Sequence, residues 1–130
     1  MASPRPDRAR TFALACSLAA SLASGALAAG CGTTDDRPAT LEVVALEVLA
    51  PTCGTPQCHS TTTRLEGLAF DTLATARSSL RELGVTGGRG GELLEVLRED
   101  GDERMPPDMP MFEQDVALIE KWIAAGAPGL

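Results

Sequence analysis

The seven residues 53–59, CGTPQCH, constrain this chain of 130 residues more than any other stretch. They hold two of its four cysteines and its only histidine. Three interpretations of them are open: a disulfide between Cys53 and Cys58, a metal site, or covalent attachment of a haem. In haem attachment the two thiols bind the vinyl groups, and the histidine after the second cysteine ligates the iron.

The three interpretations use the motif to different extents. A Cys53–Cys58 disulfide would close only a short loop and would leave His59 without a role. A structural zinc site needs four ligands, more than this stretch supplies. Haem attachment uses all three residues, but its common spacing is CxxCH, whereas four residues separate the cysteines here. Gly54 and Pro56 suit the tight detour that the longer spacing requires, so haem and disulfide both stay open on this motif alone.

The N-terminus is typical of an export signal. Arg5, Arg8 and Arg10 precede an uncharged run of small and apolar residues that extends to residue 30. As a permanent membrane span this run is marginal, because Ala, Ser and Gly dilute it. We therefore expect residues 1–30 to be removed, and Cys16 with them.

The signal ends in LAAGC, which resembles the lipobox of bacterial lipoproteins. This predicts that Cys31 becomes the lipidated first residue of a chain held on the periplasmic side of a membrane or in the cell envelope. Leu27 lies one step further from the cysteine than is usual. The alternative is a cut after Ala28, which would leave Cys31 as a free thiol. Residues 31–40 are polar and contain Gly, Asp and Pro, so they predict a tether.

The charge and the aromatic content of the residues after position 30 limit which partners and bound groups we expect. Beyond residue 30 the chain holds eight basic and seventeen acidic residues, which argues against nucleic acid as a partner and favours proteins with basic patches. Only Phe70, Phe112 and Trp122 supply aromatic rings there. Because aromatic side chains usually carry much of the packing in a small domain, a bound group could complete the core.

Periodicity predicts an all-α domain over residues 41–130. Apolar residues recur at helical spacing from Leu41 to Leu49, with Thr40 as N-cap and Pro51 as the stop. A second helix is expected from Asp71, as N-cap, to Gly84, which would end it. Shorter patterns predict helices over residues 92–99 and 113–125, separated by a proline-broken stretch. No segment reads as a strand.

Two further motifs carry a family resemblance: RMPP at residues 104–107 and KWIAAGA at residues 121–127. Together with the cysteine motif they resemble the monohaem cytochrome c-like domains of planctomycete type, which occur in exported bacterial lipoproteins. The resemblance covers residues 41–128. It implies a small helical domain wrapped around one covalent haem c, which Cys53 and Cys58 would hold, with His59 as proximal ligand of the iron.

The resemblance also implies that the methionine of RMPP, Met105, is the distal ligand. A thioether is a neutral, soft donor, and the two prolines that follow stiffen the loop that would present it. Met109, also followed by proline, is the rival ligand and Met111 the third choice. The alternative role for any of them is to fill a gap in the core.

The chain departs from the family pattern in its CxxxxCH spacing and in Phe112, where relatives tend to place a small hydroxyl residue before the last helix. The resemblance implies an exported, membrane-tethered carrier of single electrons that serves an unidentified redox partner protein and is not itself an enzyme. Phe70 and Trp122 would be neighbours of the haem. The alternatives are a redox-inert binding or structural module stapled by a Cys53–Cys58 disulfide, and a haem protein whose open distal site admits peroxide or gases.

Overall fold

The computed structural model describes residues 35–130, so the predicted signal segment and Cys31 lie outside the described residues. The described part is a small helical domain, as the periodicity predicts, and its one β-type pairing is an isolated bridge between Thr86 and Arg89. Between residues 35 and 130, no helix has both the length and the apolar character that a bilayer span requires.

The first helical stretch runs through three consecutive elements: α1 (Leu41–Val43), the π-helical segment η1 (Val44–Leu49) and α2 (Ala50–Thr52). The predicted N-cap is confirmed, since Thr40 Oγ1 accepts a hydrogen bond from the Val43 N–H at 3.3 Å. Pro51 does not stop the helix, which continues to Thr52. The π-helical turns change the hydrogen-bond register just before the proline. Pro51 lies directly after this change, so its missing N–H falls where the regular i→i−4 bonding is already interrupted.

Helix α3 (Leu73–Glu82) has a different N-cap from the predicted one. Thr72 caps it, in a reciprocal capping box with Thr75. Asp71 is instead used by the preceding loop, because its carboxylate accepts hydrogen bonds from the N–H and hydroxyl of Thr61. The predicted end of the helix is confirmed: Gly84 follows it with a φ of +76°, a conformation that favours glycine.

The last two helices match the predictions to within one residue at each end: α4 spans Gly91–Arg98 and α5 spans Glu113–Ala124. Phe112 is the N-cap of α5 and makes no side-chain hydrogen bond there. Trp122 of α5 is fully buried, and its indole N–H donates to the Pro128 carbonyl at 3.1 Å. The indole therefore binds the end of the chain to the core.

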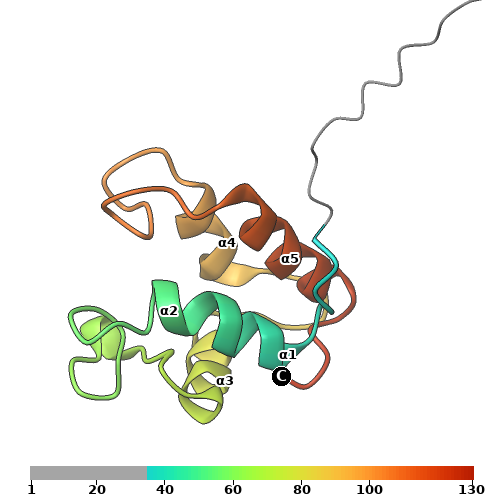
Figure 1. The fold of residues 1–130 in the computed structure, drawn as a ribbon, viewed down its shortest axis with the longest axis horizontal. Helices are drawn as coiled ribbons and strands as arrows, with labels where there is room; N and C mark the ends of the chain where they lie inside the picture. Colours follow the sequence, from blue (N-terminus) through green and yellow to red (C-terminus); the bar gives the residue numbers. More distant parts are fainter. Residues whose placement is uncertain (1–34) are drawn as a thin grey trace, which may run out of the picture. The chain divides into compact units, whose positions relative to one another are not determined.

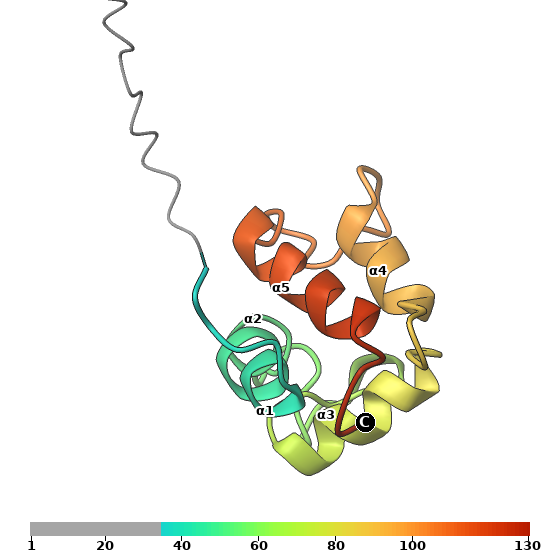
Figure 2. The same cartoon turned by 90° about the vertical axis from the view of Figure 1, so that its right-hand side faces the viewer.

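The first helical stretch packs between the other elements. Its η1 segment contacts both α3 and α5, and its buried side chains join those of α3, α4 and α5 in one hydrophobic core. The views in Figure 1 and Figure 2 show α4 beside α5 and α3 beside the first stretch. In Figure 1 the loops of residues 53–70 and 99–112 extend on the same side of this arrangement.

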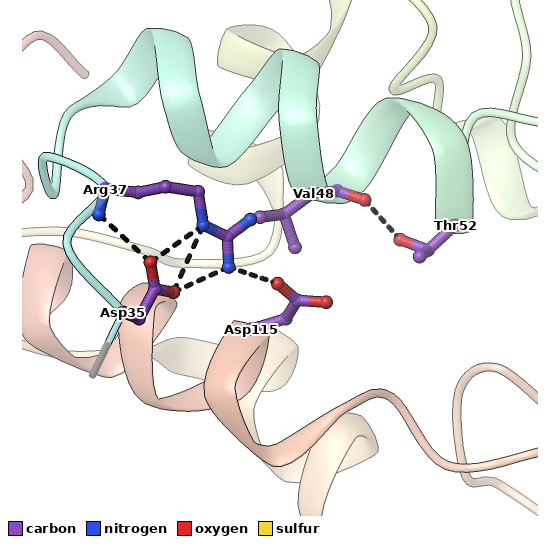
Figure 3. A network of polar contacts seen from close by, with 5 residues as sticks. All are labelled: Asp35, Arg37, Val48, Thr52 and Asp115. Atoms are coloured by element: carbon purple, nitrogen blue, oxygen red, sulfur yellow. Dashed lines mark hydrogen bonds and ion pairs between the residues drawn. The ribbon is translucent and has the colours of Figure 1, made fainter. Parts of the chain in front are cut away.

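Residues 35–40, part of the predicted tether, lie against the domain. The Arg37 guanidinium binds the carboxylate of Asp35 at 2.6 Å and that of Asp115, in the first turn of α5, at 2.5 Å, as Figure 3 shows. These ion pairs raise the pKa of Arg37 and lower that of Asp35. Ala39 packs against the core. This end of the tether is thus bound to the domain rather than extended from it.

Candidate functional site

A cavity of about 280 Å³ lies between the two loops and is partly open to solvent. We call residues 53–70 the cysteine loop and residues 99–112 the methionine loop. The cavity wall is mostly apolar, and it is formed by the end of α2, both loops, the end of α3 and one face of α4. Its residues are Thr52, Cys53, Cys58, His59, Leu65, Glu66, Leu68, Phe70, Leu83, Glu92, Leu93, Val96, Leu97, Met105, Pro106 and Pro107.

The four residues that the sequence singled out for haem all line this one cavity: Cys53, Cys58, His59 and Met105. They come from two loops separated by the helices α3 and α4, so their meeting depends on the fold and not on sequence proximity. Of the two aromatic residues expected beside a haem, Phe70 lines the cavity, whereas Trp122 does not and lies in the core.

Backbone hydrogen bonds shape the cysteine loop around its four intervening residues. The Cys58 N–H donates to Thr55 O at 3.0 Å, and the His59 N–H donates back to Cys53 O at 3.0 Å. The second bond joins the first and last residues of the motif. The two extra residues of CxxxxCH are thus held in a closed turn that leaves both cysteines and the histidine on the cavity wall.

Gly54 permits this turn because the chain passes very close to another backbone segment. A Cβ atom at this position would lie 2.8 Å from Ala50 O, 2.8 Å from Asp71 N and 2.9 Å from Phe70 C. These are backbone atoms, which cannot swing aside as a side chain can. Packing therefore requires glycine at position 54. This is a second reason, besides the conformational freedom that suits glycine to a tight turn.

His59 is oriented by a hydrogen bond between its Nδ1 and the Leu65 carbonyl at 2.9 Å. A carbonyl can only accept, so Nδ1 carries a proton, and in the neutral ring the lone pair is then on Nε2. The ring meets Phe70 edge to face, with centroids 5.8 Å apart and an angle of 81° between the planes. A backbone acceptor on one ring nitrogen is the usual partner of a histidine that ligates a metal through the other.

The two cysteines on the cavity wall are free thiols. Burial raises the pKa of the Cys53 thiol, which outweighs the opposing effect of the Thr52 hydroxyl 3.6 Å from the sulfur. This shift favours the neutral thiol of Cys53 over the thiolate. No group of three or more His, Cys, Asp or Glu side chains in residues 35–130 is arranged to hold a metal ion.

The three methionines of the methionine loop have different surroundings. Met105 lines the cavity, and its backbone N–H donates to Val96 O of α4 at 2.9 Å. Met109, the rival ligand, is 66% exposed and is not part of the cavity wall. Met111, the third choice, is 8% exposed and belongs to the hydrophobic core.

Some residues of the site carried no signal in the sequence. The Leu65 carbonyl that orients His59 lies in a stretch without clear periodicity, and a backbone acceptor is not visible in residue type. In α4, Leu93, Val96 and Leu97 line the cavity, and helical spacing alone does not distinguish such residues from those that pack only in the core. Arg104 Nε is buried without a hydrogen-bond partner among the described residues, directly before Met105.

Comparisons with protein-family models, with curated proteins and with solved structures give no match to this chain.

Proposed function

We propose that this protein is an exported, membrane-tethered c-type cytochrome that carries single electrons. One observation supports the proposal above the others: two free thiols, a histidine and a methionine line the same largely apolar cavity. Each belongs to a residue type that c-type cytochromes use, and the histidine directly follows the second thiol.

The residues present suit a haem in their donor chemistry. Cys53 and Cys58 would hold it through thioether bonds, His59 would supply Nε2 and Met105 its thioether sulfur. The cavity of about 280 Å³ is slightly smaller than the roughly 300–1,000 Å³ of ligand sites, but its opening leaves room for a larger planar group with one edge outside.

When bound, haem supplies the one-electron couple of its iron. The chain's own residues then set the conditions of transfer. Leu68, Phe70, Leu93 and Leu97 give the cavity an apolar wall, which would limit the contact of a bound group with water. The Leu65 carbonyl fixes the orientation of His59, and a thioether from Met105 favours the reduced metal. If each loop supplied one donor to the iron, no position would be left for a substrate, so we propose a carrier and not an enzyme.

Attachment is tested on the full-length protein, produced with the bacterial machinery that joins haem to cysteines. The protein should keep its haem through denaturing electrophoresis, because thioether bonds survive unfolding. Cys58→Ala should reduce this retained haem strongly. A colourless protein whose mass is two hydrogens below that of the reduced chain would instead identify the Cys53–Cys58 disulfide and the redox-inert alternative.

Whether Met105 is the distal ligand distinguishes an electron carrier from a haem protein with an open distal site. Ferric iron held by histidine and methionine has a weak absorption band near the red end of the spectrum, and Met105→Ala should abolish it, admit carbon monoxide and lower the reduction potential. Met109→Ala is the matched control and should leave all three unchanged, because Met109 lies outside the cavity wall. Ready binding of carbon monoxide by the unmutated protein would favour the open-site alternative.

The membrane tether is a separate part of the proposal, based on LAAGC before the described residues. Labelled fatty acid should enter the protein at Cys31. Cys31→Ala should abolish the labelling and release the domain from the membrane fraction. An unlabelled protein that stays in the membrane fraction would contradict lipidation and leave the electron-transfer proposal untouched.

A further inference from the structure

The methionine loop is closed at its base by ion pairs. Arg98, the last residue of α4, binds both carboxylate oxygens of Glu113 at 2.9 and 3.0 Å, and Glu113 is the first residue of α5. Arg98 also binds Glu120 at 2.8 Å. The loop therefore leaves and re-enters the domain at nearly the same place, like the compact surface loops that often carry function. It projects beyond the helices in Figure 1.

Two large apolar side chains of this loop are exposed. Met109 is 66% and Phe112 71% exposed, although both flank the buried Met111. Phe112 occupies the N-cap of α5, where a small polar residue would stabilise the helix and where phenylalanine makes no capping bond. Neither side chain thus serves the core or the helix. Exposed aromatic residues and methionines are enriched in protein interfaces.

The exposed, unpaired charges of this loop are negative. Glu99, Asp100, Asp102, Glu103 and Asp108 are exposed, and none of them pairs with a basic side chain among residues 35–130. Arg104 is the loop's single basic residue, and its guanidinium is partly buried and bonds to Pro107 O. A partner that covers Met109 and Phe112 must therefore neutralise a set of carboxylates.

We propose that the methionine loop is the docking surface for the redox partner. The partner would be an exported protein whose lysines and arginines surround an apolar hollow that receives Phe112. This inference rests on the proposed function, because it names the partner of the same site. Met105 belongs to this loop and lines the cavity, so docking here brings the partner beside the cavity. The carboxylates disfavour an anionic membrane surface and a second copy of the same loop.

The test compares two variants of equal net charge. D100N/D102N/E103Q removes three carboxylates from the methionine loop, whereas E42Q/E47Q/E82Q removes three exposed carboxylates elsewhere. The probe is a lysine-rich monohaem cytochrome c, and electron exchange with it is followed by stopped-flow absorbance. The loop variant should react at least about tenfold more slowly at low ionic strength and the control much less so, and the difference should fade in high salt.

The apolar part is tested in the same way. Phe112→Ala should weaken binding of the probe about tenfold, while Leu46→Ala, at another exposed apolar position, should not. Equal effects of the two charge variants, or no effect of either, would overturn the docking surface. Calorimetric titration with the probe measures binding without haem in this chain. It therefore decides the docking proposal even if the protein proves colourless and the electron-carrier proposal fails.

Discussion

The cysteine loop and the methionine loop line the same cavity, but different interactions hold them. In the cysteine loop nine backbone N–H groups donate to backbone carbonyls. Side chains add to this network: Asp71 binds Thr61, the Thr63 hydroxyl donates to Pro56 O, and Ser79 of α3 binds both the N–H and the carbonyl of Ala69. The side of the cavity that holds His59 is therefore fixed at many points.

The methionine loop is fixed at few points. The Met105 N–H binds Val96 O, Met111 is buried in the core, and Arg98 joins Glu113 at the base. Between residues 106 and 112 no backbone N–H donates a hydrogen bond within the described part, and three of these residues are prolines, which have none to donate.

This difference has a consequence for the proposed haem site. The covalent and proximal side is organised by the chain itself, whereas the distal side depends on a few separate contacts. Losing one contact should therefore displace a large part of the methionine loop but only a small part of the cysteine loop. The loop that would present the more easily replaced ligand, Met105, is also the one that would meet the partner.

The largest effect is expected from Met111→Ala. Met111 is the only methionine-loop side chain in the core, and truncating a buried methionine costs about 2–5 kcal/mol of the free energy of unfolding. Urea denaturation followed by circular dichroism measures this loss. Because the loop loses its main apolar contact, the absorption band assigned to Met105 should weaken as well.

Met109→Ala is the control, since that side chain is 66% exposed. It should change stability by no more than about 0.5 kcal/mol. If Met111→Ala proves as harmless as Met109→Ala, the methionine loop is held by other contacts and the contrast between the two loops is mistaken.

The helices of the domain were predictable because they depend on local pattern. The apolar stripes of α3, α4 and α5 and the glycine after α3 follow rules that act within a few residues, and the structure confirms them. The predicted N-cap of α3, Asp71, was wrong because Asp71 and Thr72 are both residue types that cap helices well. The hydrogen bond from the Thr61 N–H to the Asp71 carboxylate, ten residues away, decides between them.

The cavity was only partly predictable, for the same reason. The ligand chemistry of cysteine, histidine and methionine follows from the residue type. Cys53, Cys58, His59 and Met105 could therefore be identified from the sequence. The contact of Arg37 with Asp115 joins residues 78 positions apart, and the partner of His59 is a backbone carbonyl. Neither can be read from periodicity or composition, so residues 35–40 were assigned wholly to the tether.

A smaller effect is expected from Gly54→Ala in the cysteine loop. The added methyl group would press on three backbone atoms at 2.8–2.9 Å, and overpacking of this kind costs about 1–3 kcal/mol. The variant should also retain less haem after denaturing electrophoresis, because the turn between the two thiols must open. Urea denaturation and haem staining of the gel measure the two effects.

Gly101→Ala is the matched change in the methionine loop. There the nearest atom to a new Cβ would be the end of the Glu99 side chain at 3.0 Å, which can move aside. Stability should stay within about 0.5 kcal/mol of the unmutated protein. Equal losses from both glycines would mean that the methionine loop is as tightly packed as the cysteine loop.

The smallest effect on stability is expected from replacing one carboxylate in each loop region. Hydrogen bonds from the N–H and the hydroxyl of Thr61 lower the pKa of Asp71. A group whose pKa is lower in the folded state stabilises that state above its ordinary pKa, near 4, and loses this contribution as the pH falls through the folded value. Asp71→Asn should therefore reduce stability slightly at pH 7, and the two proteins should become equal in strong acid.

Asp108→Asn supplies the comparison in the methionine loop, because Asp108 is exposed and accepts no hydrogen bond from residues 35–130. We expect this variant and the unmutated protein to have the same urea midpoint at each pH from neutral to strong acid. A difference for Asp71→Asn that persists in strong acid would show that the amide disturbs the loop sterically. If the two variants gave the same pH profile, carboxylates would contribute equally to both loops. Asp71 would then add nothing specific to the order of the cysteine loop, and carboxylate hydrogen bonds would not distinguish it from the methionine loop.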